Sequence, residues 1–372
     1  MVSYRSTHSR SLAFALALML CLAWPVAGQD FYLQANDSVV FFSNADTAAP
    51  AWKSLVETFL LLRFPSLSIQ FTDVTQDPNF DAATLRGRRA VVVASAEDAA
   101  SPTFRGFYEK VKTSAAQRCL TVLRNGAGQE VGEPGALVVD VAAALEVVAG
   151  KVRATDPDLA ATFISGIPPG HARALLIAGA VLEAWHAPGL VSAVEIDGLR
   201  GAATRVERTT VRDMENGRVM AWTQDDEALP MAFDFMDQSV GAAIQASGLA
   251  VRLNGQTLRI RGMAAERYTF TIDGERIGIF HRDQLDAGIN LALLRTPMWK
   301  RAMAVLALTR KHEELRAKRR RFLEAGPEQR KSAEWRAAME TLDAEEAALV
   351  EEQAEKAKAG THDYELQPVE QE

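Results

Sequence analysis

The sequence predicts an α/β fold in three layers, in which helices cover both faces of a parallel sheet. Strand-like and helix-like segments alternate through the first half of the 372-residue chain, a pattern typical of parallel sheets. The strand-like segments are short, continuous apolar runs such as Val91-Val92-Val93, as expected for strands buried on both faces. The predicted strands are 38–42, 67–74, 89–94, 119–123 and 162–164, and the predicted helices are 51–64, 102–117, 135–152 and 172–185.

Local signals set the bounds of these elements. The first helix has apolar residues at helical spacing, at Trp52, Leu55 and Phe59, and Pro65 ends it. The strand at 162–164 is expected to lead into a glycine/proline turn, and a strongly apolar helix follows that turn. In such sheets the functional cleft lies beyond the carboxyl ends of the strands, so the residues that follow each strand are the candidates for a site.

The second half of the chain changes character. Short strand-like runs at 191–196, 204–211, 219–222, 249–253, 257–260 and 268–272 predict a β-rich module. Asn254-Gly255 and Asp273-Gly274 are typical of hairpin turns. A charged helical hairpin is expected to follow, and after it a polar, disordered tail. The predicted parts are a signal peptide at 1–28, an α/β domain at 29–190, the β-rich module at 191–296, the hairpin at 297–358 and the tail at 359–372.

The first residues are typical of a secretory signal. Arg5 and Arg10 precede an apolar run over 11–23, and small residues at 26–28 offer a cleavage site. The run is short for a membrane span, so we expect an exported protein, periplasmic or extracellular, without a stable membrane anchor. An uncleaved anchor is the alternative. Cleavage would leave Cys119 as the single cysteine, in an apolar stretch that indicates a buried structural thiol.

The charge pattern argues against a nucleic-acid partner. The formal net charge of −7 gives no field that would recruit nucleic acid or an anionic membrane. The basic run Arg319-Arg320-Arg321 invites that interpretation, but Glu313, Glu314 and Glu324 lie beside it and indicate a solvated helix face. The histidines have no metal-ligand spacing, and no phosphate loop or dinucleotide fingerprint is present, so no metal and no cofactor is expected.

Two blocks of sequence resemble those of a known family. Residues 36–47 have a strand that runs into Ser43-Asn44-Ala45-Asp46-Thr47, similar to a strand followed by Gly-Asp-Ser and often Thr. Residues 162–182 are similar to an Asp-x-x-His-Pro segment followed by Gly-His and an apolar helix, here Gly170-His171 and 175–182. These blocks resemble the SGNH/GDSL hydrolases, and the segments 272–274, 287–292 and 296–298 resemble a subset of its exported bacterial members. The resemblance implies a flavodoxin-like three-layer domain.

The resemblance also implies an ester-hydrolysing site, but the catalytic positions hold unsuitable residues. Such a site needs a serine nucleophile, a histidine base, an acid that orients it and donors for the oxyanion. The nucleophile position falls on Ala45, and the two oxyanion positions fall on Thr75 and Glu97. The acid falls on Thr162 and the base on Ser165, neither of which titrates near neutral pH. The sequence therefore predicts a pseudo-esterase, an exported binding or scaffold module.

Two alternatives remain open. Ser43, Asp46 and His171 lie close enough in sequence to the lost positions to rebuild a displaced site, which would give an active serine esterase or carbohydrate deacetylase. The other alternative is a structural envelope protein that assembles through its helical pair. The partners expected are a saccharide or acyl ester in the vestigial cleft and a protein bound by the C-terminal helices.

Overall fold

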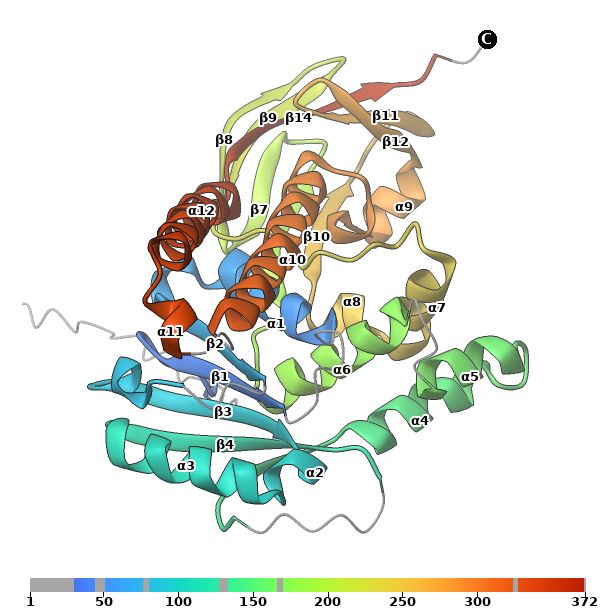
Figure 1. Ribbon diagram of the computed structural model, residues 1–372. Helices are drawn as coiled ribbons and strands as arrows, with labels where there is room; N and C mark the ends of the chain where they lie inside the picture. Colours follow the sequence, from blue (N-terminus) through green and yellow to red (C-terminus); the bar gives the residue numbers. More distant parts are fainter. Residues whose placement is uncertain are drawn as a thin grey trace, which may run out of the picture. The chain divides into compact units, whose positions relative to one another are not determined.

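A computed structural model describes residues 30–43, 51–75, 80–126, 133–165, 170–323 and 327–370. Residues from Phe31 to Glu372 form one compact unit. Its first sheet has five strands in the order β2-β1-β3-β4-β5, and all neighbours are parallel (Figure 1). The predicted α/β fold with a parallel sheet is thereby confirmed. The strands are β1 (Ser38–Ser43), β2 (Gln70–Thr75), β3 (Arg89–Ser95), β4 (Gln117–Arg124) and β5 (Leu137–Asp140).

Alternate residues of the interior strand β1 enter two different cores. Val39 and Phe41 pack with α1 (Ala51–Arg63), α4 (Val141–Val152) and α6 (His171–Ala184). Val40 and Phe42 pack on the opposite face. Because successive side chains of a strand point to opposite faces, a strand buried on both sides reads as an unbroken apolar run. On the second face lie α2 (Ala96–Ala99), α3 (Pro102–Ser114) and the 3₁₀ turn Ala82–Leu85.

The prediction of a strand at 162–164 is wrong, because these residues lie in helix α5 (Pro157–Ser165). The Asp156 carboxylate accepts from the backbone N–H of Leu159 at 2.9 Å, and Pro157 occupies the first helical position. This is a strong helix start. Ala160 and Phe163 lie three residues apart and are both buried on one face of the helix.

A second, four-stranded sheet has the order β13-β10-β6-β7. Its central strands β6 (Leu190–Asp197) and β10 (Gly255–Arg261) are parallel, with α7 (Gln238–Ser247) and α8 (Leu249–Arg252) between them in the chain. The predicted strand at 249–253 is therefore wrong: Gly248, with φ of 73°, ends α7 and starts the short α8. The edge strands are β7 (Ala202–Glu207) and β13 (Ile289–Asn290).

The two predicted hairpin turns have different outcomes. Asp273 and Gly274 have φ of 52° and 73° and join two antiparallel strands, as predicted. The Asn254-Gly255 prediction is wrong, because Asn254 is fully buried and its side-chain oxygen accepts from the N–H of Met231 at 2.7 Å. The Asn-Gly dipeptide therefore does not always mark a turn: here the asparagine is buried and hydrogen-bonds a backbone group far away in sequence.

A third sheet contains the C-terminal segment. Its five antiparallel strands have the order β12-β11-β14-β9-β8, so β14 (Thr361–Pro368) lies in the middle and the predicted disordered tail is wrong. Tyr364 and Leu366 of β14 are buried, and Tyr364 stacks on Trp222 with ring centroids 5.1 Å apart. Two apolar residues with period two are enough to fix this strand, although its composition is polar. The other strands are β8 (Thr209–Asn216), β9 (Met220–Asp226), β11 (Arg267–Ile272) and β12 (Glu275–His281).

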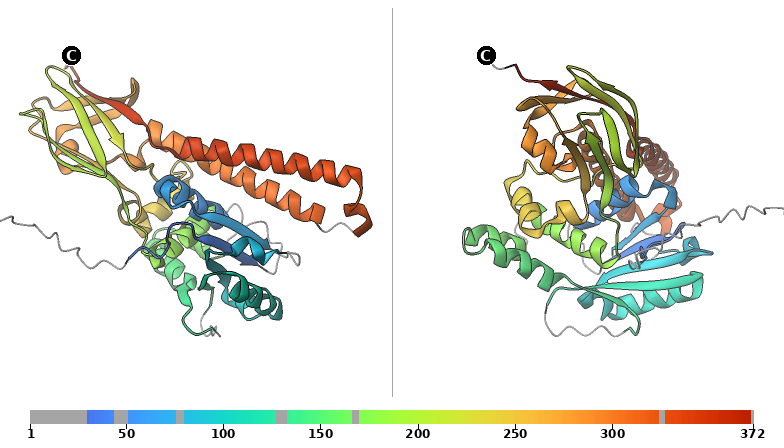
Figure 2. Two further views of the ribbon diagram at one scale, coloured as in Figure 1. Left: turned by 90° about the vertical axis from the view of Figure 1, so that its left-hand side faces the viewer. Right: turned by 180° about the vertical axis from the view of Figure 1, so that it is seen from behind.

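Two long helices, α10 (Pro297–Leu323) and α12 (Ala333–Ala357), occupy nearly the ranges predicted to be helical and pack on each other. Figure 2 shows the pair projecting past the parallel sheet. At its other end Arg301 of α10 donates to the backbone carbonyls of Lys356 and Glu355. The remaining short elements are α9 (Arg282–Ala287), α11 (Pro327–Arg330) and the 3₁₀ turns Pro65–Leu67 and Leu291–Leu293. None of the helices in the described part of the chain combines the length and apolarity that a membrane span needs.

Candidate ligand pocket

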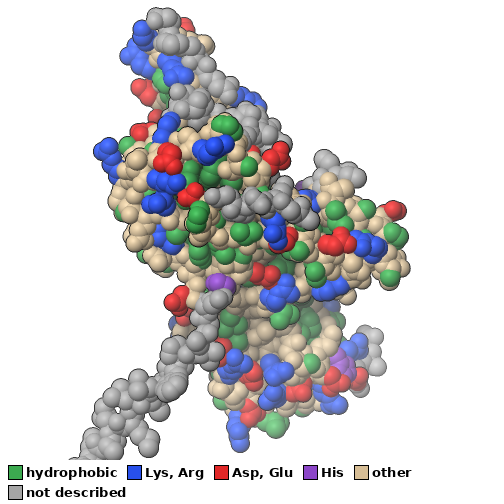
Figure 3. Space-filling view, turned by 90° about the horizontal axis from the view of Figure 1, so that it is seen from below, with side chains coloured by type: hydrophobic (Ala, Val, Ile, Leu, Met, Phe, Trp, Pro, Cys, Tyr) green, Lys and Arg blue, Asp and Glu red, His purple; other side chains and the backbone are tan. Residues whose placement is uncertain are grey.

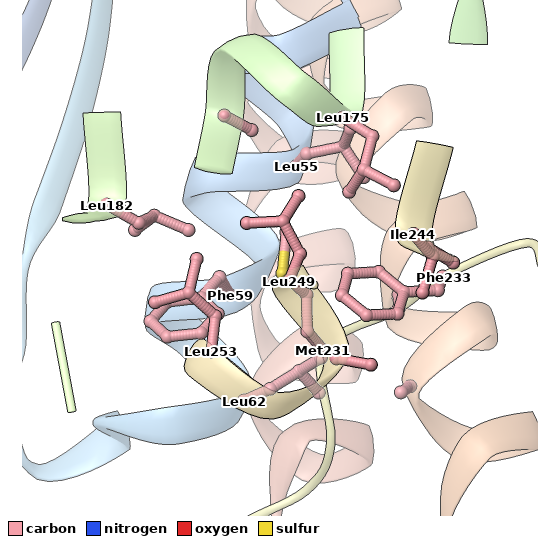
Figure 4. Close-up of a cluster of buried hydrophobic side chains, with 14 of the residues drawn as sticks. Leu55, Phe59, Leu62, Leu175, Leu182, Met231, Phe233, Ile244, Leu249 and Leu253 are labelled. Carbon is pink, nitrogen blue, oxygen red and sulfur yellow. The ribbon is translucent and has the colours of Figure 1, made fainter. Parts of the chain in front are cut away.

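A small apolar pocket lies where α1 and α6 begin. It adjoins Ala51, the first residue of α1, and His171, the first residue of α6. Figure 4 shows three of its wall residues, Leu55, Leu175 and Phe233, within the buried cluster that joins α1, α6 and the chain before α7. The lining residues are Ala51, Leu55, His171, Ala174, Leu175, Ala232, Phe233, Asp234, Val240, Leu306 and Arg310.

The pocket has a small volume. It encloses ≈ 40 Å³. A water molecule needs about 10–15 Å³ on this measure, so the pocket holds a group of about three non-hydrogen atoms. Its walls are mostly aliphatic and aromatic carbon, with a few polar groups, as is usual for small-molecule sites. An acetyl-sized group fits this space.

A histidine held by a carboxylate stands in the pocket wall. His171 is the first residue of α6, placed there by Gly170 in the left-handed region with φ of 52°. Its Nδ1 lies 3.2 Å from Oδ2 of Asp237. The His171 side chain is 43% exposed and that of Asp237 is 25% exposed, so the pair can be reached by solvent. The contact fixes the ring with Nδ1 toward the acid, which leaves Nε2 as the nitrogen that can meet a ligand.

Asp237 is itself held firmly. Its Oδ1 accepts from the N–H of Ser239 at 2.8 Å and from the hydroxyl of Ser239 at 2.7 Å, so it caps the start of α7. The Ser239 hydroxyl and, after it, His171 and the backbone donors lower the pKa of the Asp237 carboxyl, against the opposing effect of burial. The carboxylate therefore stays charged at neutral pH and orients the imidazole.

Two opposite charges complete the wall. Asp234 precedes α7 and Arg310 belongs to α10, and both are exposed. Neither side chain has an ion pair or hydrogen bond to any other described residue. Arg310 brings a cation from the helical pair to the rim of a pocket that α1, α6 and the segment around α7 also line.

The structure scatters the residues that the sequence singled out. Ala45 and Asp46 lie outside the described residues. Ser43 and Thr75 are the last residues of β1 and β2 and are register partners. Glu97 is exposed in the first turn of α2, after the end of β3.

Thr162 and Ser165 lie on α5, and Ser165 is exposed. The Thr162 hydroxyl donates to the carbonyl of Leu159 at 2.7 Å, within the helix. Of the six predicted positions that the structure describes, only His171 lines the pocket. The sequence analysis missed Asp237 and Arg310. The order Asp237-Gln238-Ser239 predicts a helix cap, but nothing in the sequence links it to a histidine 66 residues earlier.

A buried cluster of charges fixes the helical pair next to the pocket. On α1, Glu57 accepts from Arg316 at 2.9 Å and Ser54 donates to Glu313 at 2.6 Å. On the outer side, His312 lies 2.9 Å from Glu346 of α12. Burial raises the pKa of the Glu313 carboxyl to about 7, with the Ser54 hydrogen bond opposing it. Since α10 also supplies Leu306 and Arg310, this cluster positions one wall of the pocket.

The described residues offer no metal centre. Within them, no three side chains of His, Cys, Asp or Glu come together as ligands. Cys119 is half-buried on β4 and receives a hydrogen bond from Arg89 at 3.2 Å, so it is less enclosed than its apolar surroundings predict.

No family model matches the sequence, and no curated protein matches it. One solved structure is similar, described as BT4096, a gut microbial diltiazem-metabolizing enzyme. The two chains are 16% identical, and the match covers 91% of this chain and 98% of the other with a TM-score of 0.68. At this identity the likeness shows a shared fold. Its coverage is too large for the α/β half alone, so the later sheets and helices belong to the shared architecture.

Proposed function

We propose that this protein is an SGNH-type domain that binds a small acyl ester in the pocket beside His171 and does not cleave it. The strand order 2-1-3-4-5 is the order of flavodoxin-like sheets, which supports this assignment. The observation that carries the proposal is the lining of the pocket: among the described residues that form it there is no serine, threonine or cysteine to attack a carbonyl.

The walls favour an acyl group over a bare saccharide. Leu55, Leu175, Phe233 and Leu306 present carbon, and they contribute binding energy only to an apolar group. The Arg310 guanidinium, which lines the same pocket, can donate a hydrogen bond to a carbonyl oxygen at the rim. A bound ester would therefore place its acyl group inside and its alcohol part outside.

Binding to acetylated sugars tests this proposal. Calorimetric titration of the full chain with an O-acetylated oligosaccharide is expected to show binding, and the same sugar without acetyl groups is expected to bind at least tenfold more weakly. Ala51→Phe fills the rim and is expected to abolish the difference. Ala333→Phe makes the same change at the exposed first residue of α12 and serves as the control. Equal affinity for the two sugars would contradict the proposal.

An active esterase with displaced residues is a second candidate, and the His171–Asp237 pair favours it. A carboxylate on Nδ1 is the arrangement that orients a histidine general base. Ser43, at the end of β1, is the hydroxyl proposed to act with it. This candidate predicts turnover of p-nitrophenyl acetate that His171→Ala, Asp237→Asn and Ser43→Ala each reduce at least a hundredfold. No turnover above a heat-inactivated sample would remove it.

We also propose that the protein is exported, from the basic and apolar pattern of residues 1–28. N-terminal sequencing of the protein recovered from its native cells is expected to begin near residue 29. A mature chain that still contains the apolar run would contradict export with cleavage.

A further inference from the structure

The structure separates the charges of α10 into two groups. Glu313 turns inward to Ser54, and Arg316 turns inward to Glu57. Arg319 pairs with Asp343 and with Glu346, the latter at 2.7 Å, on the side of α12. Glu313, Arg316 and Arg319 therefore all have partners on neighbouring elements.

Four cations remain together on the outer face of the helix. Arg310, Lys311, Lys318 and Arg321 are exposed and have no ion pair with another described residue. At 3.6 residues per turn they lie within an arc of about 100°, together with one acid, Glu314. We name Arg310, Lys311, Lys318 and Arg321 the basic face of α10. Figure 3 shows Lys and Arg side chains, with some Asp and Glu, at the top of the view, where the helical pair projects.

The basic face begins at the pocket. Arg310 lines the pocket, and Arg321 lies eleven positions further along the same helix, about 16 Å away at 1.5 Å per residue. A ligand that enters the pocket with one group and continues along α10 meets successive cations. This is an unusual feature in a chain of net charge −7.

We propose that the acyl ester is carried by an anionic polysaccharide, a chain of uronate sugars whose carboxylates lie on the basic face of α10. The binding of the acyl group in the pocket rests on the proposed function. Carboxylates on successive sugars match a row of Lys and Arg side chains, and the acetyl group matches the apolar pocket. Nucleic acid fits less well, because no aromatic side chain lies within the arc of the basic face itself, and Phe322 at its margin is half-buried.

Binding of polyuronates of different composition tests the proposal on the full chain. The probes are partially O-acetylated polygalacturonate, the same polymer without acetyl groups, neutral O-acetylated xylan and a single-stranded oligonucleotide. The acetylated polyuronate is expected to bind at least tenfold more tightly than the neutral xylan, and its affinity is expected to fall as salt is raised.

Charge removal identifies the surface. The triple variant Lys311→Gln, Lys318→Gln, Arg321→Gln is expected to weaken polyuronate binding at least tenfold and to flatten its salt dependence. The control removes the same charge elsewhere, at the exposed Arg105, Lys110 and Arg276, and is expected to change the affinity less than twofold. Unchanged binding by the first triple variant would overturn the inference.

The remaining outcomes separate this inference from the proposed function. Binding that depends on the basic face but not on acetyl groups would support the basic face and contradict the pocket. Binding of xylan as tight as that of the acetylated polyuronate would support the pocket and overturn the anionic ligand. An oligonucleotide that competes at equal concentration of charge would also overturn the polysaccharide as partner.

Discussion

Ser54 of α1 donates a 2.6 Å hydrogen bond to Glu313 of α10 across the joint between the α/β half and the helical pair. The acid is near Glu57 of α1, Asp73 of β2 and Arg316 of its own helix. Lys53 pairs with Asp73, and His312, the residue before the acid, contacts Glu346 of α12. Burial raises the pKa of this carboxyl, so the free energy of unfolding should depend on pH through it.

Glu313→Gln is expected to raise the free energy of unfolding over that of the unchanged chain by more at pH 8 than at pH 5. The folded pKa of about 7 lies above the unfolded value of 4.5, so the folded state binds the extra proton. The stability from this group is fully present below pH 4.5 and is lost as pH rises to about 7. Urea unfolding at pH 5 and pH 8 should show a change in the difference of about 1–3 kcal/mol. Glu314→Gln, on the exposed outer face, should show no such change.

Glu57→Gln is expected to destabilise the protein by about 3 kcal/mol, because it leaves the Arg316 guanidinium without its buried partner. Replacing both residues, as Glu57→Leu with Arg316→Met, should recover much of that loss. Chemical denaturation of the single and double variants measures both quantities. A double variant as unstable as the sum of its single changes would show that the pair is not coupled.

Gly189→Ala is expected to prevent stable folding. A Cβ on Gly189 would lie 1.9 Å from the carbonyl oxygen of Arg252, and this contact is with backbone that cannot rotate away. A loss of more than about 4 kcal/mol is expected. Gly150→Ala in α4 meets nothing within 4 Å and should instead stabilise the helix by about 0.5–1 kcal/mol. Thermal unfolding distinguishes the two alanines.

Asp237→Ala is expected to cost about 1 kcal/mol through loss of the cap on α7. Asp237→Ser keeps a capping oxygen and should cost less than half as much, although it also removes the charge beside His171. Because the Asp237 pKa is lowered, the difference between the unchanged chain and the alanine variant should be present at neutral pH and shrink as pH falls through that value. Equal losses for both variants would show that the cap is not the cause.

The sequence predicts the parallel sheet well because β1 and β3 must be apolar on both faces. It fails where one short segment supports two structures: residues 162–164 are apolar enough for a strand, but Asp156-Pro157 starts a helix before them. It fails again at β14, where Tyr364 and Leu366 alone mark a strand in a polar segment. The average composition of such a segment is polar, so it does not reveal two apolar residues that alternate with polar ones.

The candidate site is harder to predict than the fold. The sequence singles out His171 as a candidate. Its partner Asp237 lies 66 residues later and the wall residue Arg310 lies 310 − 171 = 139 residues later. Such pairs are fixed by the packing of α6, α7 and α10, and no local pattern encodes them. Likewise, the sequence predicts that Glu313 lies with Glu314 on a solvated helix face, whereas the structure turns Glu313 inward to Ser54.

The central place of β14 has a consequence for how the chain is made. The β8–β9 and β11–β12 pairs join strands that are neighbours in sequence. In contrast, Tyr364 of β14 pairs with Trp222 of β9, which is 364 − 222 = 142 residues earlier. Until β14 emerges from the ribosome, each ribbon presents an unpaired backbone edge, at β9 and at β11, to other nascent chains. Before β14 is in place, β9 and β11 are therefore the two edges of this sheet at which wrong strand pairing between chains is most favoured.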